Sequence, residues 1–355
     1  MNKIKVLMVG SETTVKGGMT TVVNSFLNHS FSKYEIEYIP THYNCGIIKN
    51  ILSFFGNIIR LSKAIKENQI IHMHMSERGS CIRKYIVFKI AKKNNKKIII
   101  HTHGAEFKEY YSNLSYNMKR RIIELLTGCD EVITLGENWN EYFKSLSSDI
   151  RCRILKNSVE IAPYKVSMDD KDFNILFLAI IDKRKGIYDL IEAANKILKV
   201  YVGDKKINFI IAGTGKEEEE IKKIVKQYKL NNNFNFLGWI DGEKKKEVLK
   251  NTHLFVLPSY NEGLPVSILE AISYGIPVIS TDVGSINEAV LNNFNGYLIE
   301  PGNIKELKCK INNIIENEEL WIKFSNNSKQ LCKQEFNSEE YFRNIEKIYD
   351  ELIQN

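Results

Sequence analysis

The chain has 355 residues, of which 43% are hydrophobic and 26% are charged, and its formal net charge is +7. A single hydrophobic core rarely grows beyond ~250–300 residues, so this length predicts two globular domains. The modest basic excess suits an anionic ligand, such as a nucleotide diphosphate, or an anionic membrane surface.

Several classes of protein are excluded by the same sequence. Six scattered cysteines form neither a zinc-binding spacing nor a disulfide framework. No RNA- or DNA-binding signature is present, so no nucleic acid partner is expected. No stretch reaches the ~20 apolar residues that a bilayer-spanning helix requires. We therefore expect a cytoplasmic protein that can rest on the inner face of the membrane.

Short apolar runs alternate with longer amphipathic segments along the chain. The first series predicts strands at 3–9, 34–39, 69–75, 97–101, 131–135 and 151–155, and helices at 19–27, 47–66 and 82–93. The second series predicts strands at 173–179, 207–212, 233–237, 254–257, 277–280 and 297–299, and helices at 187–200 and 217–228. This alternation predicts α/β architecture with parallel sheets covered by helices on both faces.

The polar segment 161–172, which contains Pro163, separates the two series. We therefore expect one Rossmann-like domain over 1–163 and a second over 172–337, with the last helical pattern, 338–355, packing back on the first. Two doubly wound domains facing each other would form a central cleft lined by the carboxyl ends of their strands, where ligands of such sheets bind.

The segment 254–275 (LFVLPSYNEGLPVSILEAISYG) combines a buried strand, a loop and a helix. Pro265 stands near the start of the helix, where its missing N–H costs nothing. Unsatisfied N–H groups from Gly263 and Leu264 onward, together with the helix dipole, would suit a diphosphate. This part of the segment therefore predicts an anion site.

Two carboxylates flank that anion site. Glu270 lies within the helix, where it can accept hydrogen bonds from a vicinal diol such as that of ribose. Glu262 precedes the helix and would face whatever is attached to the second phosphate. The alternative is a surface loop with an incidental pair of carboxylates.

With these residues, the segment resembles the E-x7-E motif of retaining, GT-B-fold glycosyltransferases of family 4 (group 1). The stretch after it is similar to that family's G-x-P-V-I block, with Ser285 where the family has a second Gly, and 295–302 is similar to its next block. The resemblance covers the whole chain and is weakest over 118–161. It implies that Glu262 holds the donor sugar and that Glu270 holds the ribose.

A second basic loop follows the strand within 174–186 (NILFLAIIDKRKG). Lys185 is placed to neutralise a phosphate and to stabilise a departing nucleotide diphosphate. The family usually has Gly-Arg directly after this strand, where this chain has Ala179 and Ile180. Arg184 is a candidate to replace the missing arginine. The alternative for both cations is a solvated basic turn.

In the first domain, Gly17 and Gly18 follow the first strand and would let the backbone approach a ligand closely. They resemble the family's first loop, which lies over the donor phosphate or the acceptor, although an ordinary flexible turn has the same sequence. The segment 101–107 (HTHGAEF) resembles the family's fourth-strand loop. That resemblance implies a contact between His103 and the 6-hydroxyl of the donor sugar.

Two His-x-His pairs, His72/His74 and His101/His103, each end a predicted strand, where alternate residues share a face. Four imidazoles from two strands could bind a metal, so a metal-dependent hydrolase is one alternative. The D-x-D triplet at 170–172 is interpreted as linker charge. The resemblance implies chemistry that needs no metal and no cofactor, so no metal ligand is assigned.

The resemblance implies an enzyme that moves a sugar, with retention, from a nucleotide diphosphate sugar to a glycan or lipid-linked glycan acceptor in surface polysaccharide, capsule or lipopolysaccharide assembly. A UDP-sugar is the favoured donor. A nucleotide-sugar epimerase and a binding protein without turnover are alternatives. The segments 49–66 and 82–97 mix basic and apolar residues at helical spacing. They are either solvated helix faces or surfaces that contact an anionic membrane.

Overall fold

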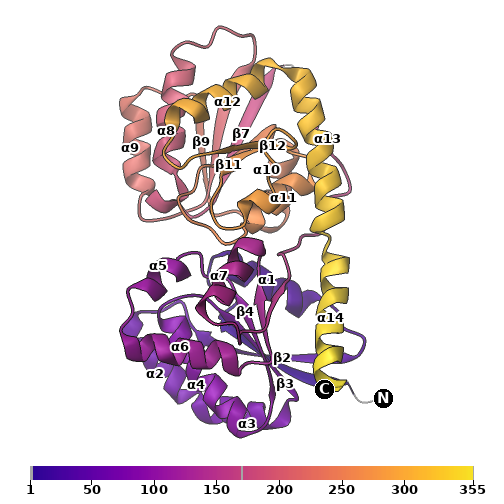
Figure 1. Cartoon of the computed structure of the whole chain (residues 1–355). Helices are drawn as coiled ribbons and strands as arrows, with labels where there is room; N and C mark the ends of the chain where they lie inside the picture. Colours follow the sequence, from indigo (N-terminus) through magenta and orange to yellow (C-terminus); the bar gives the residue numbers. More distant parts are fainter. Residues whose placement is uncertain (1–2, 169–170, 355) are drawn as a thin grey trace. The chain divides into compact units, whose positions relative to one another are not determined.

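The computed structural model describes residues 3–168 and 171–354. The chain forms two compact units (Figure 1): unit 1 is made of residues 1–157 and 339–355, and unit 2 of residues 158–338. Each unit has one six-stranded sheet in which every pair of neighbouring strands is parallel.

Unit 1 has the strand order β2-β1-β3-β4-β5-β6. Its strands are β1 (Ile4–Ser11), β2 (Tyr34–His42), β3 (Ile70–Met75), β4 (Lys97–Thr102), β5 (Glu131–Thr134) and β6 (Cys152–Ile154). Its helices are α1 (Gly18–Asn28), α2 (Ile47–Gly56), α3 (Ile58–Glu67), α4 (Gly79–Lys93), α5 (Phe107–Ser112), α6 (Tyr116–Gly128), α7 (Glu137–Leu146) and α14 (Ser338–Gln354).

Unit 2 has the strand order β12-β11-β10-β7-β8-β9. Its strands are β7 (Asp172–Leu178), β8 (Lys206–Ala212), β9 (Phe234–Gly238), β10 (Leu254–Leu257), β11 (Val278–Thr281) and β12 (Gly296–Ile299). Its helical elements are η1 (Lys183–Lys185), α8 (Ile187–Leu198), α9 (Glu218–Gln227), α10 (Gly242–Lys250), α11 (Val266–Ser273), η2 (Ile286–Glu288), α12 (Ile304–Glu316) and α13 (Glu318–Glu335).

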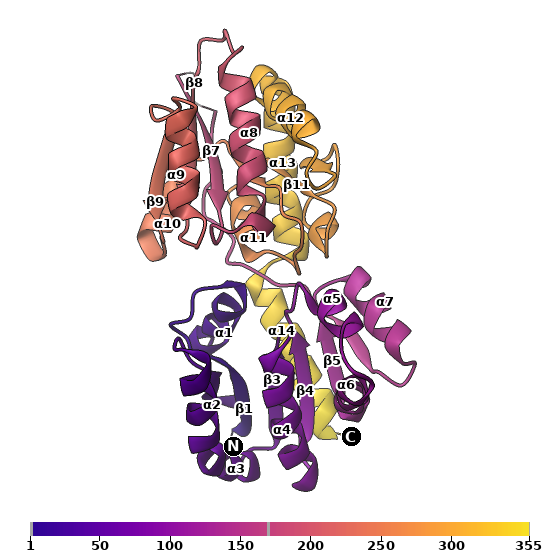
Figure 2. The ribbon, with the colours of Figure 1, turned by 90° about the vertical axis from the view of Figure 1, so that its left-hand side faces the viewer.

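Helices cover both faces of each sheet, as expected for strands that are apolar on both sides. In β3 all six residues are buried, and in β10 all four are buried. In unit 2, α8 packs against α9 and α12, whereas α11 packs against α13 (Figure 2). The twelve strands lie where the sequence predicts them.

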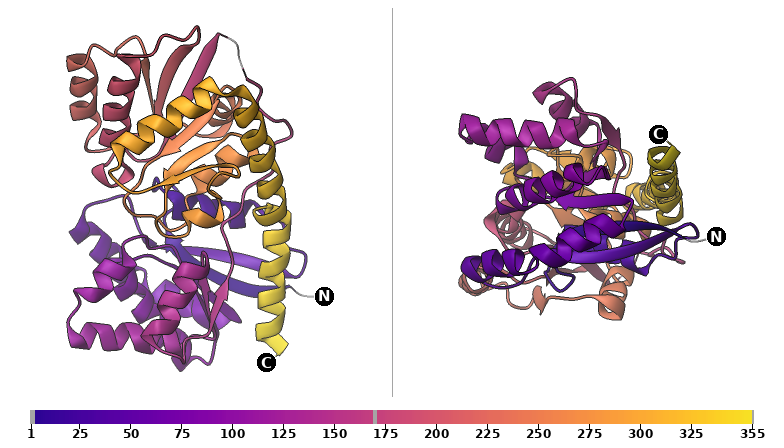
Figure 3. Two further views of the ribbon diagram at one scale, coloured as in Figure 1. Left: turned by 45° about the horizontal axis from the view of Figure 1, so that its top comes forward. Right: turned by 90° about the horizontal axis from the view of Figure 1, so that it is seen from below.

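The C-terminal helix α14 belongs to unit 1, as predicted (Figures 1 and 3). Its buried Tyr349 shares a 2.7 Å hydrogen bond with His72 Nδ1 on β3. Lys33 forms an ion pair of 2.7 Å with Asp350 near the end of the same helix. A helix far along the chain thereby completes the layer that covers the sheet of unit 1.

Two details differ from the sequence prediction. The units divide between Asn157 and Ser158, earlier than the expected boundary at 163–172, because 158–168 pair with unit 2. Val166, for example, donates its N–H to the carbonyl of Tyr274 at 2.9 Å. Asp170 of the D-x-D triplet lies outside the described residues, whereas Asp172 begins β7.

The second difference is the helix predicted over 47–66, which is broken into α2 and α3 at Asn57. Gly56, a poor helix former, ends α2. The Asn57 side chain donates to the hydroxyl of Tyr43 at 2.6 Å and fixes the break. Over the described residues, none of the helices combines the length and the apolar character needed to cross a bilayer.

Candidate functional site

In unit 2 the strand order reverses between β7 and β10, so the loops that follow these two strands meet at the carboxyl edge of the sheet. Gly186, which joins η1 to α8, has a φ of 72°, and a Cβ there would lie 1.9 Å from the carbonyl oxygen of Pro258. Only glycine allows this approach. Arg184 accepts the N–H of Tyr260 at 2.8 Å and donates from Nη1 to the carbonyl of Asn261 at 2.7 Å. The two loops are thus tied together.

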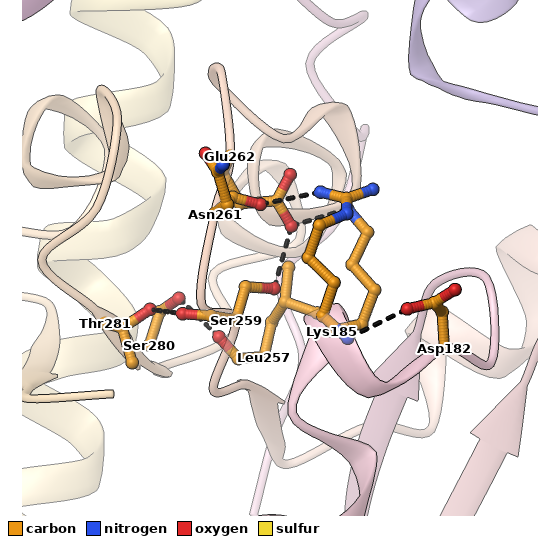
Figure 4. Close-up of polar contacts among 9 residues, drawn as sticks. Asp182, Lys185, Leu257, Ser259, Asn261, Glu262, Ser280 and Thr281 are labelled. Carbon is orange, nitrogen blue, oxygen red and sulfur yellow. Dashed lines mark hydrogen bonds and ion pairs between the residues drawn. The ribbon is translucent and has the colours of Figure 1, made fainter. Parts of the chain in front are cut away.

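A buried ion pair occupies this junction (Figure 4). The ammonium of Lys185 lies 2.5 Å from Glu262 Oε1, and the two side chains are only 14% and 6% exposed. Ser259 donates its hydroxyl to the same carboxylate oxygen at 2.8 Å. Ser259 is held in turn, because its carbonyl accepts the hydroxyl of Thr281 at 2.5 Å. The sequence predicts Lys185 and Glu262 as site residues in two separate segments, and in the structure they form an ion pair.

The start of α11 lies directly after Glu262. Pro265 is the N-cap residue, and its carbonyl accepts the N–H of Ile268 at 3.2 Å. The N–H groups of Val266 and Ser267 take no partner among the described residues. Gly284 packs so closely on the preceding loop that a Cβ would lie 2.0 Å from the carbonyl oxygen of Glu262. Ser285, which replaces the family glycine, is fully buried and donates its N–H to the carbonyl of Gly263 at 2.8 Å. The main chain at position 285 therefore supports this loop, while the buried Ser285 hydroxyl takes no hydrogen bond from the described residues.

Glu270 also has a cationic partner. Lys245 Nζ on α10 lies 2.5 Å from Glu270 Oε1, with both side chains largely buried. The three lysines 244–246 stand in a charged run, of which Lys244 and Lys246 are exposed and Lys245 is partly buried. The pair forms because α10 and α11, which are separate in the sequence, come together in the fold. No local sequence pattern predicts this contact.

The structure leaves several predicted donor contacts as predictions. Arg184 is engaged with the carbonyl of Asn261. Ile180, at the usual arginine position, is 38% exposed. Gly17, with a φ of 155°, and Gly18 begin α1 in unit 1, and a Cβ at either would meet open space.

The four histidines lie together in unit 1, at the carboxyl ends of β3 and β4. His74 Nδ1 and His103 Nε2 are 2.9 Å apart, and the rings of His72, His74 and His101 stack on one another. Burial lowers the pKa of His72 and of His103 to about 3, and it lowers the pKa of His74 and His101 well below the usual value. The cluster is therefore neutral at physiological pH.

The positions of the histidine nitrogens can be compared with those that a metal site would need. One nitrogen from each of His72, His74 and His101 lies within 4.8 Å of the others. Tetrahedral zinc with Zn–N bonds of about 2.0–2.1 Å brings ligand nitrogens much closer together. Rings stacked at interplanar angles of 10° to 28° also hold their in-plane lone pairs in nearly parallel planes, which is unfavourable for convergence on one ion. A metal would require the rings to rotate, so this arrangement favours a packed neutral cluster.

Helix α2 and the start of α3 in unit 1 expose a large apolar surface. We call it the α2 face, and it consists of Ile47, Ile48, Ile51, Leu52, Phe55 and Ile59, each 50–82% exposed. Lys49, Arg60, Lys63 and Lys66 lie in the same segment and are exposed. The sequence has no Asp or Glu between Glu37 and Glu67. Contiguous exposed apolar side chains of this kind mark interaction surfaces.

Comparison with known proteins finds a family match over most of unit 2. Residues 159–331 match the family model described as glycosyl transferases group 1. A glycosyltransferase of Methanocaldococcus jannaschii is 26% identical over 375 residues, covering 98% of this chain and 99% of the relative. The O-antigen biosynthesis glycosyltransferase WclY of Escherichia coli is 24% identical over 288 residues, covering 76% of this chain and 77% of WclY.

Solved structures show the same fold. HepE of Anabaena, in complex with UDP-glucose, superimposes with a TM-score of 0.78 at 18% identity, covering 98% of this chain and 100% of that one. The family match spans every residue of the Lys185–Glu262 and Lys245–Glu270 pairs. Residues 159–331 therefore resemble the group 1 glycosyltransferases, and the chain has the GT-B fold.

Proposed function

We propose that this enzyme transfers a sugar from a UDP-sugar to a glycan or lipid-linked glycan, with retention at the anomeric carbon, during assembly of a surface polysaccharide. The observation that carries the proposal is the buried Lys185–Glu262 pair beside the start of α11. Two relatives support it: HepE has been solved in complex with UDP-glucose, and WclY is an O-antigen biosynthesis glycosyltransferase.

The donor diphosphate would bind between Lys185 and the first turn of α11. An ammonium has three N–H donors, and one of them is directed at Glu262, which leaves two for phosphate oxygens. The helix N-terminus adds unpaired N–H groups and a positive dipole end. Both features stabilise the negative charge that develops on the departing UDP. Stabilising such charge in the transition state is usually the largest contribution to the rate.

The two carboxylates would hold the rest of the donor. Glu262 Oε1 takes the hydrogen bonds from Lys185 and Ser259. Its second oxygen takes no hydrogen bond from the described residues, so it can accept hydroxyls of the sugar. Glu270 would accept the ribose hydroxyls, with Lys245 fixing its orientation. His103 on the 6-hydroxyl, Arg184 on phosphate, and Gly17 and Gly18 near the donor or acceptor remain predictions of the family resemblance.

In the proposed step, the bond from the anomeric carbon to the diphosphate breaks as the acceptor oxygen bonds to the same face of that carbon. The acceptor proton passes to the departing phosphate. This route does not require the pair of catalytic carboxylates that glycosidases use, and it needs no metal. We therefore expect turnover to be unchanged by EDTA, and a loss of turnover restored by added Mg²⁺ or Zn²⁺ would contradict this part of the proposal.

We also propose that the α2 face rests on an anionic membrane that carries the acceptor. The apolar side chains would enter the headgroup region while the neighbouring lysines and arginine meet anionic lipid.

The test of the proposed function is UDP release from individual UDP-sugars, with and without a lipid-linked oligosaccharide acceptor. NMR of the product gives the anomeric configuration. We expect acceptor-dependent release of UDP and a product with the donor's configuration. An isomerised nucleotide sugar formed without acceptor would support an epimerase instead, and donor binding without turnover would support a binding protein.

A further inference from the structure

Three basic residues of unit 1 gather where β1 and β2 end. His42 is the last residue of β2, and Arg83 and Lys84 lie in the second turn of α4. Lys84 is 1% exposed, and its ammonium donates to the hydroxyl of Thr41 at 2.6 Å. The hydroxyl of Thr41 donates a hydrogen bond to the carbonyl of Gly10 at 3.0 Å. The buried ammonium therefore has a neutral partner for only one of its three N–H bonds.

Within the described part of the chain, the two cations of this cluster, Arg83 and Lys84, lack a carboxylate partner, although Glu12 lies near enough to His42 to favour its charged form. Among the described residues, neither Arg83 nor Lys84 has an acidic side chain within ion-pair distance. Arg83 Nε and His42 Nδ1 are buried without a hydrogen-bond partner. A buried charge without a compensating partner is strongly destabilising, and a bound anion would supply that partner.

The electrostatics of the three groups agree. Burial, and then Arg83, lowers the pKa of Lys84 to about 7. Burial likewise lowers the pKa of Arg83. The pKa of His42 is lowered by burial, Arg83 and Lys84, and only Glu12 opposes these effects. The three groups repel one another's charge, and an anion among them would reverse that repulsion.

The place of the cluster in the fold also favours a ligand. In unit 1 the strand order reverses between β1 and β3, and doubly wound sheets bind ligands at the carboxyl end of such a switch point. The cluster lies at this edge, on the end of β2 and on the helix that follows β3. The α2 face begins at Ile47, only five residues after His42.

We propose that His42, Arg83 and Lys84 form a binding site for a phosphate or diphosphate group. Arg83 supplies a planar fork of donors that matches phosphate oxygens, His42 adds a ring nitrogen, and Lys84 adds positive charge behind them. Assigning this group to the acceptor rests on the proposed transfer reaction, because a lipid-linked acceptor carries phosphate next to its apolar chain.

The experiment is thermal unfolding of the full chain, with saturating UDP present so that the donor site in unit 2 is occupied. The probes are inorganic phosphate, pyrophosphate, farnesyl diphosphate and phosphatidylglycerol vesicles. The variants are Lys84→Met, Arg83→Gln and, as a control with the same charge change on the exposed side of α4, Lys93→Met. Arg83→Gln keeps the test open if Lys84→Met does not fold.

We expect pyrophosphate or farnesyl diphosphate to raise the midpoint of wild type and Lys93→Met, and most of that rise to be lost in the two site variants. Without anion, Lys84→Met should melt higher than wild type, because a buried charge is removed. A larger rise with farnesyl diphosphate than with pyrophosphate identifies a lipid diphosphate. Equal rises with the two identify a free-phosphate site, and a response to vesicles alone contradicts the site.

The proposal is overturned if anions shift the site variants as much as wild type, or if Lys84→Met melts lower without anion and gains as much from the anion. The proposed transfer function fails separately, through the absence of a UDP-induced shift or of UDP release. The UDP-induced shift reports on the donor site of unit 2, and both readouts should be unchanged in Lys93→Met.

Discussion

Lys185 and Glu262 illustrate how one contact can serve both folding and binding. Each is almost fully buried, so each needs the other's charge when no ligand is present. Removing one partner of such a pair typically costs about 3–5 kcal/mol, whereas replacing both with apolar groups is often neutral. The effects on stability and on turnover can therefore be separated by combining substitutions.

The first prediction uses this separation. Lys185→Met and Glu262→Gln should each lower the free energy of unfolding, and the double variant should recover much of the loss. All three should lose transfer by at least ~100-fold, the usual effect of removing a group that stabilises developing charge. Urea unfolding and UDP release measure the two quantities. Wild-type-like turnover in either single variant would refute the site assignment.

The second prediction concerns Lys245, which we regard as a positioning residue. Lys245→Ala should raise the KM for the donor several-fold and change kcat less, because Glu270 loses the partner that orients it toward ribose. Lys245→Arg should restore much of the binding. The exposed Lys244→Ala is the matched control. An equal fall of kcat at unchanged KM would assign Lys245 to the chemical step instead.

At this scale the sequence identified residues by motif and missed those defined by distant contacts. Glu262, Glu270 and Lys185 stand in recognisable segments. Lys245 was hidden in a charged helix, and Lys84 in a segment that reads equally well as a solvated face. Burial of a lysine depends on which strand ends surround it, and no local pattern contains that information.

Among the elements, α2 departs most from an ordinary surface helix. It buries Asn50 and Phe54 and turns its other large apolar side chains outward. A helix that exposes apolar groups beside basic ones, without acidic neighbours, is suited to an anionic interface. Its orientation depends on the break at Asn57, which lets α3 bury a different set of residues.

The third prediction follows from this orientation. Ile48→Glu combined with Leu52→Glu should remove binding to phosphatidylglycerol vesicles, as measured by flotation, without lowering the melting temperature. Val202→Glu, an equivalent change at an exposed apolar residue of unit 2, should bind as wild type does. Vesicle binding should weaken as the salt concentration rises, because salt screens the attraction between the basic residues and the anionic lipid. Dimerisation lost in the α2 variant, with vesicle binding unchanged, would show that the face binds a second copy.

The sequence predicts the elements better where periodicity is strong than where it is interrupted. All twelve strands were found because buried parallel strands form short, dense apolar runs. The break at Asn57 depends on a side-chain bond to Tyr43, and α5, α6 and α7 were not among the predicted helices. Tertiary contacts decide both cases.

For the whole molecule, the buried histidines make unit 1 the acid-sensitive part. Their pKa values are lowered by burial, to about 3 for His72 and His103, while unfolded histidine titrates near 6.5. Above about pH 7 neither state binds protons on these rings. As the pH falls below 6.5, these histidines bind protons in the unfolded chain but stay neutral in the folded unit. The free energy of unfolding then falls, by up to ~1.4 kcal/mol per pH unit for each ring, until about pH 3.

The fourth prediction is a steep loss of unit 1 stability between pH 7 and pH 5. Trp139 is the one tryptophan of unit 1, so a variant with Trp239→Phe and Trp321→Phe reports its urea unfolding by fluorescence. Adding His101→Leu should make the pH dependence shallower, since neither nitrogen of that ring has a partner. A free energy of unfolding that is the same at both pH values would contradict a buried neutral cluster.

The central claim is that unit 2 binds a UDP-sugar at the junction of Lys185, Glu262 and α11, and thermal unfolding with nucleotide sugars tests it most directly. A ligand at 100 times its Kd stabilises the folded state by about 2.7 kcal/mol. We predict that a UDP-sugar raises the midpoint of wild type more than GDP- or ADP-sugars do, and that Lys185→Met loses this rise. No rise with any UDP-sugar, or an equal rise in Lys185→Met, would contradict the claim.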